Sequence, residues 1–274
     1  MVIKTLDHTS FDNIITCFFK AFENYFVPIP NNKELFKSRW ENAGVNFRYS
    51  YGMFHEDQLV AFIIHAIDHR NGHLTAFNSG TGVLPEYRGQ RIVQKIYAQA
   101  IPQLKEIGVT KCALEVITQN IKAIKAYERT GFRIHKTFHC YNGSIAPITT
   151  HSNLNIERTE VSKIDWTSLP HQHMYSWDHQ KETLEKSDFT LFKVYFQDKW
   201  ESYFIMDTAR GYVAQLDIVA PSNNVWNRLF QGIHEISDHI KINNVDSEFK
   251  EKIEALEKIN LPRVVDQYEM ELYI

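Results

Sequence analysis

The chain has 274 residues, of which 43% are hydrophobic and 23% are charged, and its formal net charge is −3. This length predicts two domains of ordinary size, and this composition excludes a disordered or fibrous protein. The small negative charge provides no basic field for a phosphate backbone, so no nucleic-acid partner is expected.

The cysteines and the hydropathy exclude further classes. Cys17, Cys112 and Cys140 form no CxxC or Cys/His ligand spacing, so neither a disulfide framework nor a metal site is expected. No uncharged apolar run approaches the ~20 residues that a membrane span requires, and the N-terminus lacks the apolar core of a signal peptide. We therefore expect a cytoplasmic protein without a membrane partner.

Periodicity in the first half predicts an α/β (α+β) fold, in which helices flank a mixed, mostly antiparallel sheet. Thr9 and Asp12 are expected to form the cap of the first helix. In chain order, we expect a strand at 2–6, a helix from Phe11 that ends before Pro28, a helix at 32–42, strands at 47–54, 59–67 and 74–84, a helix from Ile92 that stops near Gly108, a strand at 112–117, a helix at 121–130 and a strand at 133–141.

The loop between a strand and a helix at residues 82–93, GVLPEYRGQRIV, carries the first chemical signal. Such a geometry collects unpaired backbone N–H groups at the positive end of a helix dipole, which suits a pyrophosphate. Arg88 adds a full charge and a forked donor. Taken alone, this loop is equally compatible with a structural turn.

A second signal follows the strand at 112–117, in residues 120–132, NIKAIKAYERTGF. Asn120 suits the N-terminus of the predicted helix. Ala123, Ile124 and Tyr127 share its inward face, so the phenol of Tyr127 is expected to point toward the sheet.

Together these two segments resemble the GNAT superfamily of N-acetyltransferases: VLPEYRGQRIV is similar to its acetyl-CoA motif, and NIKAIKAYERTGF to the helix that follows. The resemblance is specific over residues 82–132. It implies the acyl-CoA N-acyltransferase fold and an enzyme that moves acetyl from acetyl-CoA to a primary amine of a small molecule or peptide. A non-catalytic acyl-CoA sensor, a transferase that uses another acyl-CoA, and a homodimer remain open.

The same resemblance implies roles for individual residues. Tyr127 would protonate the departing thiolate, because a phenol with a pKa of about 10 is protonated at neutral pH, and Asn120 would bind near the reactive end of the cofactor. A catalytic base is not marked by the motifs. From their positions, Glu115 is the nearest carboxylate candidate and His65, His69 and His73 are others, with a structural or solvated role as the alternative for each; a water relay on an already neutral amine would need no such base. The expected cofactor-binding residues are Val83, whose backbone would pair with the pantetheine arm, Leu84, Arg88, Gly89, Gln90, Arg91, Ile92, Val93, Asn120, Ala123 and Tyr127; the N–H groups of 89–93 and Arg88 would hold the pyrophosphate.

Two positions depart from the family pattern. Arg91 and Val93 stand where the acetyl-CoA motif has small residues. Arg91 fits if its backbone is helical and its side chain points outward. Val93 would narrow the approach of a phosphate.

The second half resembles a degenerate copy of the first. The strand–acidic turn–strand pattern of 53–64 recurs at 195–206, and helices at 225–236 and 247–259 alternate with strands at 239–245 and 264–274. The loop at 221–224 lacks arginine and glycine, and Leu256 replaces the tyrosine. We therefore expect a catalytic domain at 1–145 and a degenerate domain at 146–274, with two unrelated units as the alternative.

The connection between the halves is expected at 142–166, with a strand at 154–161. His171, His173 and His179 could suggest a metal, but a solvated helix start fits their spacing better because no ligand pattern accompanies them.

Overall fold

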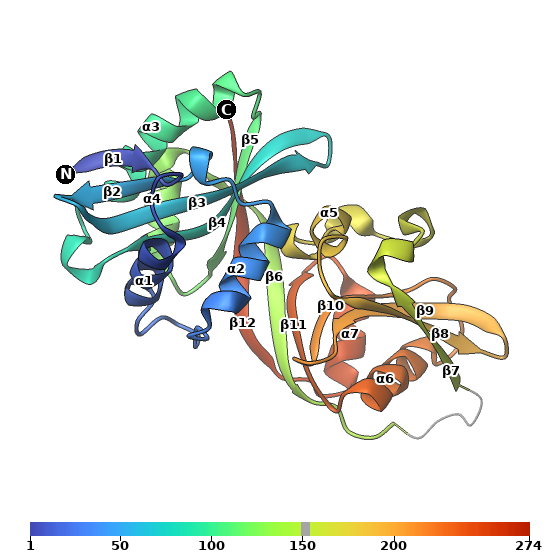
Figure 1. Ribbon diagram of the computed structural model, residues 1–274. Coiled ribbons are helices and arrows are strands. Elements are labelled where there is room, and N and C mark those ends of the chain that lie inside the picture. The colour runs from blue at the N-terminus through green and yellow to red at the C-terminus, as the bar shows by residue number, and fades with distance from the viewer. Residues whose placement is uncertain (149–153) are drawn as a thin grey trace. The chain divides into compact units, whose positions relative to one another are not determined.

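The computed structural model describes residues 1–148 and 154–274, which form two compact units (Figure 1). Unit 1 contains Met1–His135 together with Tyr268–Ile274, and unit 2 contains Lys136–Gln267. The C-terminal residues therefore return to unit 1. As a division of function, the ranges 1–145 and 146–274 stay a prediction.

Unit 1 is a mixed sheet between two pairs of helices. Its strands follow the order β1-β2-β3-β4-β5-β12; β1 to β4 pair antiparallel, and β4 pairs parallel with β5. The elements are β1 (Val2–Thr5), α1 (Phe11–Ala21), α2 (Lys33–Ala43), β2 (Tyr51–His55), β3 (Gln58–Arg70), β4 (His73–Val83), α3 (Ile92–Glu106), β5 (Lys111–Ile117), α4 (Ile121–Thr130) and the end of β12 (Arg263–Tyr273).

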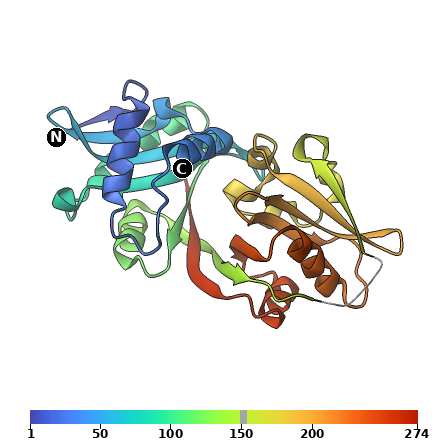
Figure 2. The ribbon, with the colours of Figure 1, turned by 60° about the horizontal axis from the view of Figure 1, so that its bottom comes forward.

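Strand β3 shows why the sheet lies between helices. Its run of apolar residues is buried on both faces, as expected for a central strand. Phe62 stacks on Phe18 of α1, with ring centroids 5.9 Å apart, whereas His65 faces Tyr97 of α3 at 5.8 Å. Helices α1 and α2 thus cover one face, and α3 and α4 cover the other (Figures 1 and 2).

The helix caps confirm most of the expected boundaries. Asn32 and Asn120 accept hydrogen bonds at the N-termini of α2 and α4, and Gly44 closes α2 with a positive φ. The cap of α1 is Ser10, whose side chain accepts from the Asn13 N–H, so the expected capping box at Thr9 is wrong.

One expected strand begins too early. Residues 47–49, Phe47–Tyr49, form a 3₁₀ helix instead of the start of a strand. The side chain of Asn46 accepts from the Arg48 N–H and caps this turn, because asparagine competes for local backbone donors. The aromatic residues that predict a strand here are therefore overridden by a cap.

Unit 2 repeats the order strand–strand–strand–helix–strand–helix–strand, and its strands follow the order β12-β6-β11-β10-β9-β8-β7. Here β10 and β11 are parallel, whereas β9 is antiparallel to β8 and β10. Its elements are β6 (Arg133–Ser144), which begins in unit 1, β7 (Leu154–Glu160), α5 (Lys181–Leu184), β8 (Thr190–Phe196), β9 (Lys199–Asp207), β10 (Tyr212–Ile218), α6 (Val225–Ile236), β11 (His239–Asp246), α7 (Lys250–Lys258) and the start of β12, as far as Gln267.

The expected mixed, mostly antiparallel sheet with flanking helices is thereby confirmed, as is the strand at 154–161. Within the expected connection at 142–166, residues 149–153 lie outside the described residues. The expectation of a solvated helix start is wrong for His179, which is 1% exposed and lies 2.7 Å from the Tyr212 hydroxyl through Nε2.

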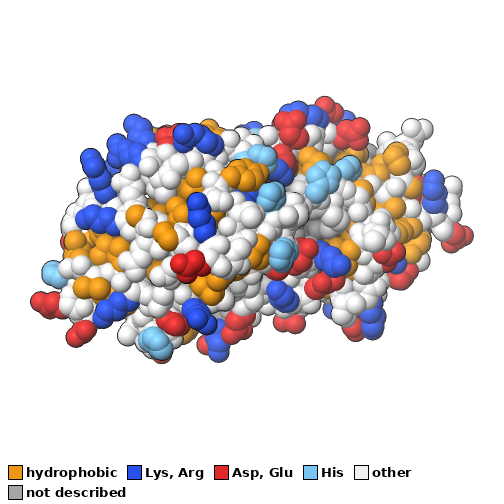
Figure 3. Space-filling view, turned by 90° about the horizontal axis from the view of Figure 1, so that it is seen from above, with side chains coloured by type: hydrophobic (Ala, Val, Ile, Leu, Met, Phe, Trp, Pro, Cys, Tyr) orange, Lys and Arg blue, Asp and Glu red, His pale blue; other side chains and the backbone are white. Residues whose placement is uncertain are grey.

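On the visible face of Figure 3, acidic and basic side chains lie among one another. Among the described residues, no helix is both long enough and apolar enough to cross a membrane.

Candidate active site

Two parallel strands of unit 1 separate before they end. Strands β4 and β5 pair from Thr75 and Lys111 as far as Asn78 and Leu114, although β4 runs on to Val83 and β5 to Ile117. The pairing of β4 with β3 shifts by one residue after Asn78, which is a β-bulge that bends the strand. Ligands of sheets with parallel strands bind at the carboxyl ends of those strands, so this split between β4 and β5 is the candidate site.

A buried polar cluster lies at the split. Asn78 Nδ2 donates to Thr81 Oγ1 at 2.6 Å and to the Tyr97 hydroxyl at 3.0 Å. The Tyr127 hydroxyl is hydrogen-bonded with Thr81 and Asn78. Burial raises the pKa of Tyr127 to about 12, against the smaller opposite effect of these hydrogen bonds. The phenol at the split is therefore protonated at neutral pH.

The loop after α1 adds a second phenol. Tyr25 hydrogen-bonds with the side chain of Asn120, and burial raises its pKa. It lies near enough to Tyr127 to contribute to the raised pKa there. Sequence reasoning missed Tyr25, Asn78 and Thr81. The only signal for Tyr25 is its place among aromatic residues in a segment without periodicity.

The loop before α3 is fastened by Arg88. Its Nε donates to the Val83 carbonyl at 3.1 Å, and its second terminal nitrogen donates to the Ala21 carbonyl at 3.0 Å. The loop is thus tied to the end of β4 and to the end of α1. Gly89 has a φ of 80°, and a Cβ added there would meet open space.

The N-terminus of α3 is open to a ligand. No side chain caps it among the described residues, so the N–H groups of its first turn are available to an anion. Its N-cap, Arg91, has a φ of 56° and a ψ of 31°. The condition under which Arg91 would fit, a helical backbone, is therefore not met: the chain turns into the helix through the left-handed region, which favours glycine.

The structure brings most of the expected residues to the split or to the adjacent loop. Val83 ends β4, and Glu115 is the first residue of β5 beyond the paired segment. Leu84 and Ile92 are buried in the core of unit 1. Partly exposed are Val93, Ala123 and Asn120; exposed are Arg91, Gly89 and Gln90.

The three histidines offered as bases do not share one environment. His65 is fully buried; its Nδ1 donates to the Tyr49 carbonyl at 2.7 Å, and burial lowers its pKa to about 4. His69 and His73 lie beside the turn between β3 and β4, at the opposite end of β4 from the split. Glu115 is the one carboxylate among these four candidates, and it lies just beyond the paired segment of β5.

One cluster of side chains in unit 1 contains residue types that can coordinate a metal ion. Ligand atoms of His135, Glu269 and Glu271 lie within 4.8 Å of one another. However, Lys111 Nζ lies 2.8 Å from Glu271 Oε1, so the lysine already neutralises the carboxylate that would bind a cation. This group lies on the paired part of the sheet, apart from the candidate site.

The region that contains the candidate site is similar to known proteins. A family model described as Acetyltransferase (GNAT) family matches residues 12–132. N-alpha-acetyltransferase 30 of Schizosaccharomyces pombe is 30% identical over 101 residues, which are 36% of this chain and 67% of that protein. The residues matched by the family model include the split, the loop before α3 and the helix of Tyr127.

Solved structures match the whole chain in fold. A Pyrococcus horikoshii protein assigned to the acetyltransferases superimposes with a TM-score of 0.71 at 17% identity, covering 100% of this chain and 89% of that one. A tandem GNAT protein from the clavulanic acid biosynthesis pathway superimposes with a TM-score of 0.70 at 9% identity, covering 99% and 97%. At these identities the likeness concerns the fold, which includes both units.

Proposed function

Because this chain belongs to the acetyltransferase (GNAT) family and is an acyltransferase with an acyl-CoA co-substrate, we propose that it transfers acetyl from acetyl-CoA to a primary amine of a small molecule or peptide. The observation that carries the proposal is the split between β4 and β5, with a protonated phenol at the split and an uncapped helix N-terminus beside it. The name of the fission-yeast relative favours a peptide α-amine as the first acceptor to test.

The described residues fit an acyl-CoA. In this proposal, the backbone of Val83 and its neighbour Leu84 holds the pantetheine arm, and the N–H groups of residues 89–93 hold the diphosphate. Arg88 positions that loop through its bonds to two carbonyls. Ala123, on the first turn of α4, borders the cofactor where a larger side chain would obstruct it.

Acetyl-CoA supplies the thioester, and the residues of the split handle the protons. A neutral amine attacks the carbonyl, and the proton that its nitrogen releases must finally reach the sulfur. We assign proton donation to Tyr127, whose hydroxyl is held by Thr81 and Asn78. Since its pKa is higher than that of a thiol, near 8.5, donation must be coupled to reprotonation of the phenol.

The remaining polar groups take supporting roles in the same proposal. Asn120 binds near the reactive end of the cofactor and hydrogen-bonds Tyr25, which places both at the acceptor side. Glu115 receives the proton of the amine, directly or through water. Holding the amine and the thioester together lowers the entropic part of the reaction barrier.

Calorimetric titration with CoA, together with thiol release from acetyl-CoA over a panel of peptides and small amines, tests this function. We expect binding, and release that depends on the amine. Binding without release for any amine would favour an acyl-CoA sensor. Faster release from propionyl-CoA or a longer acyl-CoA would favour another donor, and the absence of binding would refute all three readings.

A further inference from the structure

The backbone plan of the proposed acyl-CoA site occurs a second time, in unit 2. Strands β10 and β11 are parallel and pair only at Tyr212 and Lys241 and at Val213 and Ile242. The pairing of β10 with β9 then shifts by one residue, as in β4. The next helix, α6, again has a left-handed N-cap without a side-chain cap in the described chain, Asn224 with a φ of 60°. Unit 2 therefore keeps both the split and the uncapped helix N-terminus.

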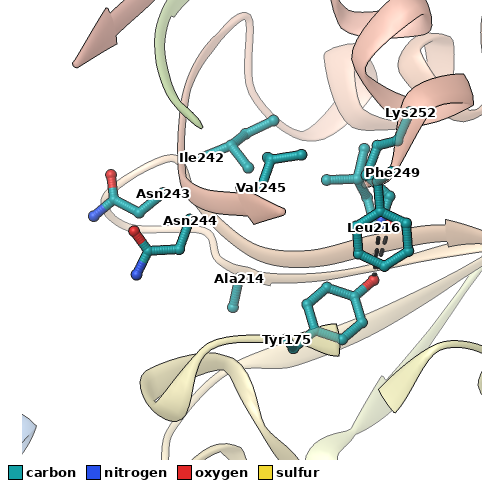
Figure 4. Close-up of a pocket in the computed structure, with 9 residues that line it drawn as sticks. All are labelled: Tyr175, Ala214, Leu216, Ile242, Asn243, Asn244, Val245, Phe249 and Lys252. Carbon is teal, nitrogen blue, oxygen red and sulfur yellow. Dashed lines mark hydrogen bonds between the residues drawn. The ribbon is translucent and has the colours of Figure 1, made fainter. Parts of the chain in front are cut away.

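A lysine from α7 occupies the split of unit 2. Lys252 is 3% exposed, and its Nζ lies 3.3 Å from Asp217 Oδ2 and 3.2 Å from the Tyr175 hydroxyl. The same nitrogen lies 3.7 Å from the ring centroid of Phe249. Figure 4 shows this side chain beside Phe249 and Tyr175, within a small pocket that Ala214, Leu216 and Ile242 also line.

The position of Lys252 in its helix explains the difference from unit 1. Lys252 is the third residue after the N-cap of α7, Phe249, and Ala123 is the third residue after the N-cap of α4, Asn120. Where unit 1 has a methyl group beside its split, unit 2 has a long charged side chain. That side chain takes up space that a pantetheine arm would require.

The counter-charge is held as firmly as the lysine. Asp217 lies on β10 beyond the shift in register and is 4% exposed. The Tyr175 hydroxyl donates to its Oδ2 at 3.4 Å, and His171 Nδ1 lies 3.0 Å from the same oxygen. A buried ion pair with such support resists opening, because separating the charges in a poorly solvated site is costly.

The loop before α6 is also fastened from within. Arg228 of α6 donates through Nε to Glu201 at 2.8 Å and through a terminal nitrogen to Ser222 at 2.6 Å. The Ser222 hydroxyl in turn donates to Glu201 at 2.6 Å. Arg228 and Glu201 are both almost fully buried. In unit 1, the equivalent loop is held through backbone carbonyls and keeps its glycine exposed.

We infer that unit 2 retains the frame of an acyl-CoA site but closes it with its own Lys252–Asp217 pair, so that each chain binds a single acyl-CoA, in unit 1. The inference rests on the proposed function for the location of that one site. It assigns unit 2 a structural role, in which an internal ion pair replaces a ligand.

Labelling of lysines in the folded chain tests the closure without any ligand. After brief reductive methylation of the full chain, peptide mass spectrometry compares Lys252 with Lys250, which is on the same helix and whose side chain is 69% exposed. We expect Lys252 to react more than about tenfold more slowly, since its reaction requires local opening. Equal rates would overturn the inference, whatever unit 1 binds.

Titration with acetyl-CoA tests the stoichiometry. We expect one equivalent per chain, and none for Val93→Glu, because a carboxylate in the first turn of α3 suits the helix dipole but repels a diphosphate. The control variant Asn223→Glu, which places a carboxylate just before the N-cap of α6, should bind one equivalent as the unaltered chain does. Two equivalents, or residual binding by Val93→Glu, would overturn the inference alone. No binding by the unaltered chain would overturn the proposed function and the single site together.

Discussion

At residue 127 a packing role and a chemical role coincide. Tyr127 is 7% exposed, and its ring packs edge-on against Phe132 with centroids 5.9 Å apart. Only the hydroxyl, which hydrogen-bonds with Thr81 and Asn78, can take part in proton transfer. Tyr127→Phe removes that hydroxyl and keeps the ring, so it separates the two roles.

We expect Tyr127→Phe to lower kcat by roughly 10²- to 10⁴-fold, the usual range for loss of a general acid, with little change in CoA affinity. Thiol release and calorimetric titration measure the two quantities. Tyr97→Phe is the matched control, because Tyr97 is a buried phenol that touches the same Asn78; its kcat should stay close to that of the unaltered chain. Unchanged turnover in Tyr127→Phe would show that another group donates the proton.

His65 gives unit 1 a predictable sensitivity to acid. Burial lowers its pKa from 6.5 to about 4, so between these values the unfolded chain binds a proton that the folded chain does not. The free energy of unfolding should therefore fall by about 3 kcal/mol from this group as the pH drops from 6.5 to 4. Urea unfolding across this range measures it, with His65→Asn as the control. If both proteins lose stability in parallel, His65 is not responsible.

Arg91 holds a backbone conformation that a side chain opposes. Its φ of 56° costs roughly 1–2 kcal/mol for a residue with a Cβ. Glycine avoids this strain, but its greater conformational freedom in the unfolded chain offsets about half of the stabilisation. Arg91→Gly should therefore raise the free energy of unfolding by about 0.5–1 kcal/mol. Arg91→Ala removes the same charge but keeps the Cβ, so it should bring no such gain. Equal stability of the two variants in thermal melts would argue against strain at this position.

At the scale of helices and strands, periodicity and caps predict the fold well where both agree. The expected bounds of α4 and α6 match the structure; for α4, Asn120 and Gly131 mark its two ends with residues suited to those positions. The prediction fails at residues 47–49, where aromatic residues suit a strand but the side chain of Asn46 caps a turn. Residue propensities alone do not show whether the strand preference of the aromatic residues or the cap at Asn46 prevails, because the tertiary contacts decide between them.

The candidate site is predictable only in part, for the same reason. The loop at 82–93 and the helix of Tyr127 carry sequence patterns, so their residues could be named in advance. The split between β4 and β5 arises from a bulge and from the end of a pairing, neither of which leaves a pattern in the sequence. Tyr25 and Asn78 were missed because their importance comes from that split and not from their neighbours in the chain.

One buried ion pair, between Lys252 and Asp217, joins α7 to β10. Asp217→Asn leaves the Lys252 ammonium without its counter-charge in a site where burial already lowers the lysine pKa, so the free energy of unfolding should fall by about 3 kcal/mol or more. The double variant Asp217→Asn/Lys252→Met removes both charges and should lose much less. Guanidinium unfolding compares them. If the single and the double variant are equally stable, the pair does not hold these elements together.

At the scale of the whole chain, the order of strands departs from the order of the sequence. The last seven residues, Tyr268–Ile274, belong to unit 1, whereas β6, which follows α4 directly, pairs with β11 in unit 2. Such an exchange follows from long-range pairing, so a division of the sequence into halves cannot reveal it. Unit 1 is therefore completed by a strand from a distant part of the chain.

This exchange predicts that neither 1–145 nor a chain that ends at Gln267 forms a stable unit 1. Both lack Met270, which is fully buried in the core of unit 1, and the apolar side chains that pack beside it, Tyr268, Leu272 and Ile274. Burial of each large apolar side chain contributes roughly 1.5–3 kcal/mol, which together is comparable to the whole stability of a domain. Their loss also exposes β5 as an open edge.

We expect the chain that ends at Gln267 to lose acetyl-CoA binding and to be cleaved by protease within 1–135, while unit 2 keeps a cooperative unfolding transition. A synthetic peptide of residues 263–274, added in excess, should restore part of the binding, because it supplies the missing strand by edge pairing. A peptide with Met270→Asp is the matched control, since it places a charge in the core. If the shortened chain instead binds acetyl-CoA with unaltered affinity and melts at the same temperature, unit 1 is complete without its C-terminal strand, and the exchange has no energetic importance.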